Sequence, residues 1–392
     1  MPALRSVLEP FAVAALSSAV VLACGGAGPT AALPPGPTGG YLALSVGFHH
    51  GCGIRADATY CWGMNVAGEL GDGMERTSLR PVRVAGDTPL EEIRLGPVHS
   101  CGRTAGGNAF CWGAGDRGAL GNGDTADRAI PTPVSSSASF RAIRAGGGYT
   151  CALDAEGAAW CWGANPLGQL GDGTREDRHL PVRVDAPAGL VAIATGAGHA
   201  CAVDAGGGAH CWGGNGQGQL GDGTTETRLS SVLVEGLGGF VAIAAGTSHT
   251  CALAGDGSVW CWGENVAGQL GDGQPGPGPH IRSVVPVRAQ VPVPLVQIES
   301  GAGHTCGLAA TGAAYCWGWN VDGQIGDGEL GDRATPARVQ TPERFVRIAA
   351  GAASACGIRS DGRAFCWGRN EDGELGNGDR IHHTFPWPVS EP

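Results

Sequence analysis

The chain has 392 residues, 71 of them glycine, and its 36 acidic residues outnumber its 25 basic residues to give a net charge of −11. Every basic residue is Arg, so the absence of Lys excludes Schiff-base and Lys-nucleophile chemistry. The acidic balance argues against a nucleic-acid partner, because nucleic acids are bound through clustered positive charge.

The first 24 residues have the pattern of an export signal. A single Arg5 precedes an apolar stretch over residues 11–22, which is too short for a normal membrane span. The segment 21–24, Val-Leu-Ala-Cys, resembles the lipobox of bacterial lipoproteins, in which the cysteine becomes the lipidated N-terminus. We therefore expect lipidation at Cys24. The alternative is an ordinary secretory signal with an incidental cysteine.

Residues 25–40 are rich in Gly, Pro, Ala and Thr and carry no charge, which predicts a flexible linker. Gly25, rather than Asp, follows the expected lipidated cysteine. By resemblance to Gram-negative lipoproteins, this indicates the outer membrane. We expect an exported cell-envelope protein that contacts the membrane only through its lipid anchor.

Residues 41–392 contain a sevenfold repeat marked by the tripeptide Cys-Trp-Gly. The repeat at 190–236 has four short runs, at 191–194, 199–203, 210–212 and 231–234, separated by Gly, Asp and Asn, which is typical of β-strands. We predict an all-β, seven-bladed β-propeller of four-stranded blades that closes with its two ends meeting. An open helical solenoid is discounted because no window shows a 3.6-residue period and glycine is costly in helices. The predicted repeats span about 41–90, 91–139, 140–189, 190–239, 240–294, 295–344 and 345–392.

Each repeat carries a second cysteine upstream of Cys-Trp-Gly. In the hairpin 151–161, opposing the two cysteines leaves the loop 155–157, with Gly157 where a three-residue hairpin needs a left-handed residue. Directly opposed residues lie close to disulfide distance, so we predict one disulfide per blade and an oxidising compartment. The alternatives are reduced buried thiols and zinc sites, although zinc pairs are usually spaced more closely. The predicted pairs are Cys52 with Cys61, Cys101 with Cys111, Cys151 with Cys161, Cys201 with Cys211, Cys251 with Cys261, Cys306 with Cys316, and Cys356 with Cys366.

Strand alternation assigns the two faces of each blade. Cys151 and Cys161 share one face, and Trp160 and Trp162 share the other. We expect the aromatic face of one blade to pack on the disulfide face of its neighbour, where sulfur–ring contacts are favourable. The aromatic residues are therefore interpreted as core rather than as a stacking platform for ligands.

The order of motifs within a repeat resembles that of a known family. The fifth repeat shows it at 245–249 (Ala-Gly-Thr-Ser-His), 262–265 (Trp-Gly-Glu-Asn) and 268–273 (Gly-Gln-Leu-Gly-Asp-Gly). This pattern resembles the repeat of the regulator of chromosome condensation family, which implies a seven-bladed propeller. Its eukaryotic founding members are nuclear guanine-nucleotide exchange factors. Other similar proteins are exported bacterial binding proteins, including a propeller-type β-lactamase inhibitor, and export makes this second group the better match.

Two polar positions recur in nearly every repeat. A histidine that ends Gly-x-x-His is replaced by Tyr149 and Ser354 in two repeats, which favours structural hydrogen bonding over a metal-binding ring. The Gly-Asp-Gly aspartates favour Asx-Gly turns over calcium loops, which need more oxygen ligands. We expect neither a metal nor a cofactor. These residues are His50, His99, His199, His249 and His304, and Asp72, Asp172, Asp222, Asp272 and Asp327, with Asn122 and Asn377 in the other two repeats.

The candidate partner-binding residues lie where the repeats differ. The residue after Trp-Gly varies, and Met64, Trp319 and Arg369 would lie on adjacent blades one, six and seven. His280 and Arg282 belong to, or follow, a Pro/Gly-rich insertion in the fifth repeat. This insertion is either a partner-contacting loop or a tolerated surface insertion. We predict a protein-binding rim over blades five to one.

The sequence contains no nucleophile elbow, no phosphate-cradling loop and no paired carboxylates confined to one repeat. We therefore predict a monomeric, non-catalytic propeller, not an enzyme, that binds an unknown protein or an extracellular ligand. The alternatives are an envelope enzyme acting on polysaccharide and a guanine-nucleotide exchange factor.

Overall fold

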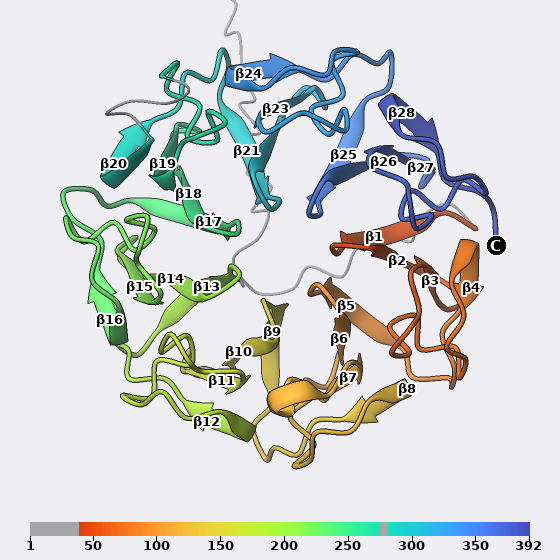
Figure 1. The fold of residues 1–392 in the computed structure, drawn as a ribbon, viewed down its shortest axis with the longest axis horizontal. Coiled ribbons are helices and arrows are strands. Elements are labelled where there is room, and N and C mark those ends of the chain that lie inside the picture. Colours follow the sequence, from red (N-terminus) through yellow and green to blue (C-terminus); the bar gives the residue numbers. More distant parts are fainter. Residues whose placement is uncertain (1–38, 275–280) are drawn as a thin grey trace, which may run out of the picture.

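The computed structural model describes residues 39–274 and 281–392, so the expected signal, Cys24, most of the linker and His280 lie outside the described residues. The strands form seven four-stranded antiparallel sheets arranged as blades around a central axis (Figure 1). Each blade uses four consecutive strands, from β1–β4 in blade one to β25–β28 in blade seven. The predicted all-β, seven-bladed propeller is confirmed.

The four strands of each blade occupy equivalent places in the ring (Figure 1). The innermost strands are β1 (Tyr41–Val46), β5 (Leu90–Leu95), β9 (Phe140–Ala145), β13 (Leu190–Thr195), β17 (Phe240–Ala245), β21 (Leu295–Ser300) and β25 (Phe345–Ala350). The second strands are β2 (His50–Arg55), β6 (His99–Thr104), β10 (Tyr149–Asp154), β14 (His199–Asp204), β18 (His249–Ala254), β22 (His304–Ala309) and β26 (Ser354–Arg359). The third strands are β3 (Thr59–Gly63), β7 (Ala109–Gly113), β11 (Ala159–Gly163), β15 (Ala209–Gly213), β19 (Val259–Glu264), β23 (Ala314–Gly318) and β27 (Ala364–Gly368). The outermost strands are β4 (Ser78–Arg83), β8 (Arg128–Pro133), β12 (Arg178–Arg183), β16 (Arg228–Leu233), β20 (Arg282–Arg288), β24 (Arg333–Arg338) and β28 (His383–Pro388), and blade two also has a short 3-10 turn, η1 (Asp116–Gly118).

The second and third strands of every blade form a hairpin closed by a disulfide. Cys151 lies directly opposite Cys161, and Gly157 in the connecting loop has φ +80°, a conformation that glycine adopts without steric cost. In all seven pairs the Cα atoms are 4.0–4.1 Å apart. The predicted register is therefore present in every blade.

All seven predicted disulfides are present, one in each blade. The bonded pairs are Cys52 with Cys61, Cys101 with Cys111, Cys151 with Cys161, Cys201 with Cys211, Cys251 with Cys261, Cys306 with Cys316, and Cys356 with Cys366. The two alternatives, reduced thiols and zinc sites, do not apply to these fourteen cysteines, because each sulfur is bonded to its partner.

The core consists of seven layers between the blades. Trp212 of blade four packs in one buried cluster with Cys151 and Cys161 of blade three, and its indole Nε1 donates to the carbonyl of Gln169 at 3.0 Å. Every Cys-Trp-Gly tryptophan is fully buried. The structure therefore confirms that the aromatic face of one blade packs on the disulfide face of its neighbour.

The ring closes without exchanging a strand between blade seven and blade one. The N–H of Tyr41 donates to the carbonyl of Gly362 at 2.8 Å, and Trp62 Nε1 donates to the carbonyl of Glu374 at 2.8 Å. Arg55 pairs with Glu391 at 2.7 Å, close to the end of the chain. The expected meeting of the first and last repeats is thus made by hydrogen bonds and ion pairs.

Candidate binding face at the channel mouth

The variable residue after each Trp-Gly is held beside the mouth of the central channel. Its backbone N–H donates, at 2.8–2.9 Å, to a carbonyl in the turn between the first two strands of the same blade. Because that turn borders the channel, the seven variable positions surround its mouth on one face. We call this set the mouth ring, and it consists of Met64, Ala114, Ala164, Gly214, Glu264, Trp319 and Arg369.

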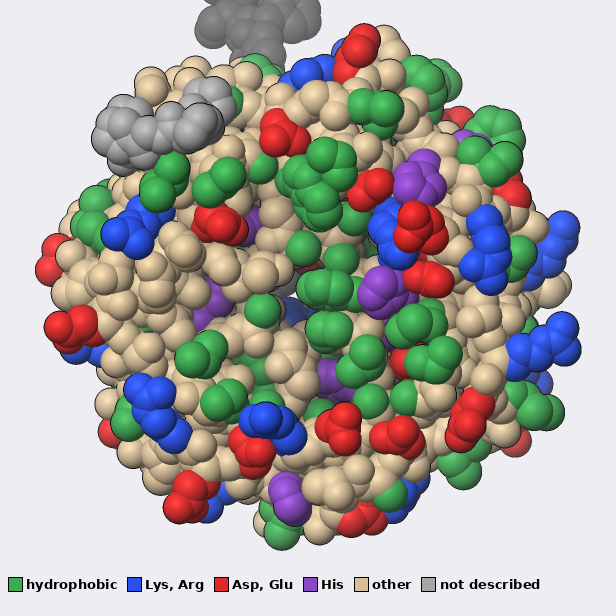
Figure 2. Space-filling view, in the orientation of Figure 1, with side chains coloured by type: hydrophobic (Ala, Val, Ile, Leu, Met, Phe, Trp, Pro, Cys, Tyr) green, Lys and Arg blue, Asp and Glu red, His purple; other side chains and the backbone are tan. Residues whose placement is uncertain are grey.

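The channel inside this ring contains a cavity of about 90 Å³ lined by residues from all seven blades. Figure 2 shows the corresponding hollow at the centre of the face. Its walls are tight because a glycine directly follows each innermost strand: a Cβ on Gly96 would lie 2.8 Å from the carbonyl oxygen of Gly146 on the next blade. The channel is therefore narrow and lined largely by small residues and backbone.

The recurrent histidines are part of the framework and not of the mouth. The side chain of each is fully buried, and in four of them Nε2 lies 2.9–3.0 Å from a Ser or Thr hydroxyl on the next blade. Burial lowers the pKa of His199 to about 4, which keeps the ring neutral. The structure assigns these residues the structural role that we predicted.

The Gly-Asp-Gly aspartates also stabilise loops. Asp222 Oδ1 accepts from the N–H of Thr224 at 3.1 Å, which forms an Asx turn, and Oδ2 pairs with Arg228 at 2.8 Å. Asn215, from the recurrent position after Trp-Gly-x, donates to Asp222 and accepts from the N–H of Leu220 at 3.0 Å. These contacts confirm the predicted Asx-Gly turns.

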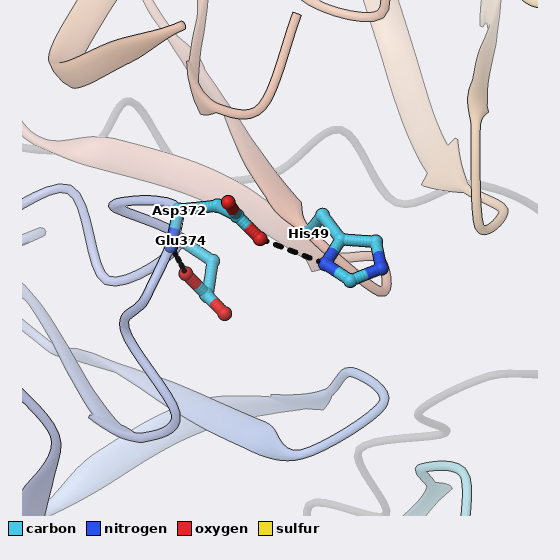
Figure 3. A group of neighbouring side chains, drawn as sticks. All are labelled: His49, Asp372 and Glu374. Carbon is cyan, nitrogen blue, oxygen red and sulfur yellow. Dashed lines mark hydrogen bonds and ion pairs between the residues drawn. The ribbon is translucent and has the colours of Figure 1, made fainter. Parts of the chain in front are cut away.

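A group of polar side chains lies on this face where blade seven meets blade one. Figure 3 shows His49 and Asp372 pointing toward each other, with Glu374 beside them, and His49 Nδ1 is 2.9 Å from Asp372 Oδ2. The three ligand atoms lie within 4.8 Å of one another, a spacing that a metal ion could bridge. However, Arg369 Nη1 lies 2.8 Å from His49 Nδ1 and 2.9 Å from Glu374 Oε1. The guanidinium of Arg369 thus already pairs with Glu374 and, at 3.3 Å, with Asp372, so the geometry favours an ion-pair network that joins the two blades.

The predicted partner-binding residues differ in their exposure and in the contacts that their side chains already make. Trp319 is half-buried against Gly303, and Met64 is half-buried in the same ring. Arg369 is only 19% exposed and is engaged in the network at the seam. Arg282 is exposed, and its Nη1 donates to the carbonyl of Gly216 on blade four at 3.1 Å. The structure therefore brings three of these residues to the mouth ring, whereas Arg282 lies on the outermost strand of blade five.

A charged group at the innermost strands and the neighbouring β6 was not predicted from the sequence. Glu92 on β5 is 13% exposed and accepts from Arg103 Nε at 3.0 Å and from Arg144 Nη1, which comes from blade three. Arg94 Nε lies 3.5 Å from the same carboxylate. The sequence did contain a pattern that could have indicated this group. The innermost strands of blades two and three carry several charged residues, whereas those of blades four and five carry none.

In residues 39–274 and 281–392, no helix is long and apolar enough to cross a membrane. A search of the curated proteins gave no match. A family model described as the RCC1-like domain matches residues 140–391, and one for the regulator of chromosome condensation (RCC1) repeat matches residues 106–153.

Solved structures share the fold at low sequence identity. Human WBSCR16 is 22% identical, with a TM-score of 0.77 over 86% of this chain and 95% of that protein. Prp20p from Saccharomyces cerevisiae, in a structure described with its binding to Gsp1p and histones, is 22% identical, with a TM-score of 0.76 over 90% of this chain and 88% of its own. Yeast RCC1 (Prp20) bound to Kap60 is 20% identical, with a TM-score of 0.77 over 99% of this chain and 91% of its own. The family model covers more than half of the chain, and this chain belongs to the RCC1-like family.

Proposed function

We propose that this protein is an exported, lipid-anchored binding propeller of the cell envelope that engages a protein or extracellular ligand through its channel-mouth face and does not catalyse a reaction. The observation that carries the binding role is the mouth ring. Side-chain identity varies there, while the surrounding backbone is fixed by the same hydrogen bond in every blade. A rigid scaffold that presents variable side chains on one face is typical of a binding surface.

Export is supported by the disulfides. All fourteen cysteines in the seven disulfides are at most 1% exposed, and such bonds persist in oxidising compartments. Anchoring through Cys24 and residence in the outer membrane rest on the sequence pattern of residues 1–25.

Mass spectrometry of the protein from the native host's membrane fraction tests location. We expect a lipid adduct on Cys24 and alkylation of the other fourteen cysteines only after reduction under denaturing conditions. An intact Met1 terminus with fourteen free thiols would contradict both export and anchoring.

Site-directed cross-linking tests the binding face. A photoreactive residue in place of Trp319 should cross-link a partner in intact cells, whereas one at Asp87 should not. Asp87 is a matched control because its side chain is 95% exposed and follows β4, at the end of the blade away from the mouth. With the partner identified, Trp319→Ala should weaken binding about tenfold or more, as expected for an aromatic anchor. Unchanged affinity would refute the mouth ring as the binding site.

The alternative of a polysaccharide-acting enzyme requires two carboxylates free for acid–base work. Asp372 and Glu374 are the acidic pair at the mouth, and both are already bound: Glu374 Oε2 accepts from the N–H of Asp372 at 2.8 Å, and Arg369 contacts both side chains. This arrangement favours the binding role.

A further inference from the structure

The charged group on β5, β6 and β9 places three guanidinium groups close together beside the central channel. Arg94, Arg103 and Arg144 all surround the carboxylate of Glu92. Glu91 pairs with Arg103 at 3.2 Å. These five side chains carry three positive and two negative charges, and Glu299 on blade six adds a further negative charge that acts on Arg144.

Two of these guanidinium groups have unused donors. Among the described residues, the Arg94 side chain makes no hydrogen bond, and its closest carboxylate contact is the 3.5 Å approach of Nε to Glu92. Within residues 39–274 and 281–392, Arg144 donates only through Nη1, to Glu92 and to the carbonyl of Ile143. Arg94 and Arg144 are 31% and 19% exposed, so water reaches both. Burial first, and the like charge of Arg94 second, lower the pKa of Arg144, while Glu92 and Glu299 act in the opposite direction.

The cavity lies next to these residues along the innermost strands. Its lining includes Leu95 and Ala145, which directly follow Arg94 and Arg144, but not the two arginines themselves. Figure 2 shows basic surface deep in the central hollow, and it belongs to arginine because the chain contains no lysine. On the next two blades, the positions equivalent to Arg94 and Arg144 are Ala194 and Ala244, which fill little of the lumen.

We propose that the central channel is a binding site for a small anion, whose carboxylate or phosphate group pairs with Arg94 and Arg144. The planar guanidinium is weakly hydrated and matches both oxyanions in bidentate geometry, so it suits a narrow and partly desolvated site. The cavity volume restricts the ligand to a few heavy atoms around the anionic group. Glu299, across the ring on blade six, interacts electrostatically with Arg144 and would repel a ligand with a second negative charge on that side.

Titration calorimetry on the full chain, at constant ionic strength, tests this proposal with inorganic phosphate and acetate as probes and glycerol as the neutral control. We expect saturable binding of at least one anion at concentrations up to about 20 mM, which corresponds to a weak but specific site. Binding to phosphate alone or to acetate alone identifies which oxyanion the site takes. Absence of saturable binding by both would overturn the proposal.

Three variants distinguish the channel from the surface. Arg94→Gln should weaken binding about tenfold or more, because a charge-assisted hydrogen bond is lost. Since the Arg94 side chain has no hydrogen bond to lose, this variant should fold normally. Ala145→Leu should also weaken binding by filling the cavity, whereas the exposed Arg183→Gln removes one positive charge and should leave affinity unchanged. Equal affinity in Arg94→Gln and the parent protein would show that any anion binding occurs elsewhere. This test is independent of the compartment and of any protein partner.

Discussion

The imidazole Nε2 of His199 lies 2.9 Å from the hydroxyl oxygen of Thr250 on the next blade. The same contact joins three other pairs of blades, and at the junction of blades three and four both of its members are replaced. Where the next blade has Ala200 in the hydroxyl position, the histidine position is occupied by Tyr149, whose own hydroxyl donates to the carbonyl of His199. The equivalent pairs are His50 with Ser100, His99 with Thr150 and His249 with Thr305.

His304 is the exception to this pairing. The next blade has Ala355 in the hydroxyl position, and both ring nitrogens of His304 are buried without a partner among the described residues. We predict that Ala355→Ser stabilises the protein by about 1 kcal/mol, because a buried polar group gains a hydrogen bond. The new hydroxyl would also reach the carbonyl of Gln324, which already accepts from Trp367. Thermal unfolding of the two proteins measures the difference.

The reverse change provides the control. Thr250→Ala removes the hydroxyl that serves His199, and we expect a loss of about 1–2 kcal/mol. If Ala355→Ser destabilises the protein as well, the hydroxyl is not what the histidine requires.

The same histidines predict a steep pH dependence of stability. Burial lowers the pKa of His50 and His249 to about 3 and that of His99, His199 and His304 to about 4. The unfolded chain binds these protons near pH 6.5. As the pH falls from about 6.5 to 4, the unfolded state therefore binds protons that the folded state does not bind. Each histidine should lower the free energy of unfolding by about 1.4 kcal/mol per pH unit in that window.

Urea unfolding between pH 7.5 and 4.5 measures this slope. His199→Gln should reduce proton uptake on unfolding by about one proton, because one group no longer titrates. The matched variant His179→Gln changes an exposed side chain and should leave the slope unchanged. If the parent protein is equally stable at pH 7.5 and 5, the lowered pKa of these buried histidines is contradicted.

The loop asparagines provide a local test. Asn215 is fully buried, accepts from the N–H of Leu220, and donates to Asp222 and to the carbonyl of Thr224 at 3.0 and 3.2 Å. We predict that Asn215→Ala destabilises the protein by about 2–4 kcal/mol, since several buried groups lose their partner. Asn215→Asp keeps the acceptor but places a second carboxylate beside Asp222, so it should also destabilise. In Asn215→Ala, amide hydrogen exchange should become faster in residues 215–224 only. Unchanged exchange in this segment would refute the role of Asn215 in stabilising the loop.

Much of this architecture follows from local patterns in the sequence. The cysteine register could be predicted because strand alternation and the position of Gly157 both specify one hairpin. The burial of the tryptophans follows from the same alternation. The contacts of Arg369 with His49 could not be predicted in this way, because they depend on how blade seven and blade one approach each other after closure. The Glu92 group was missed for a similar reason, since it joins side chains about 50 residues apart through the geometry of the channel.

Glu69 and Glu374 occupy the same position in blades one and seven, but they have different surroundings. In blades three to six this position is glutamine, and in blade two it is Ala119. Gln169 Oε1 accepts from the N–H of Leu167 at 2.9 Å. Glu69 Oε2 makes the equivalent bond to Ala67, but its Oε1 is buried without a partner among the described residues, and burial raises the pKa of this carboxyl. Because the raised pKa means that the fold favours the protonated form, its contribution to stability is lost as the pH rises through the folded pKa.

We therefore predict that Glu69→Gln stabilises the protein at pH 7.5 by about 1–3 kcal/mol, since a buried unpaired charge is replaced by a neutral group that keeps the hydrogen bond. The gain should shrink at pH 4.5, where the parent carboxyl is more fully protonated. Glu374→Gln is the matched variant: Glu374 Oε1 pairs with Arg369 at 2.9 Å, so its replacement removes an ion pair at the seam and should not stabilise. Thermal unfolding at both pH values separates the two cases. If the two substitutions change the stability equally, the ion pair with Arg369 does not make the carboxyl of Glu374 different from that of Glu69.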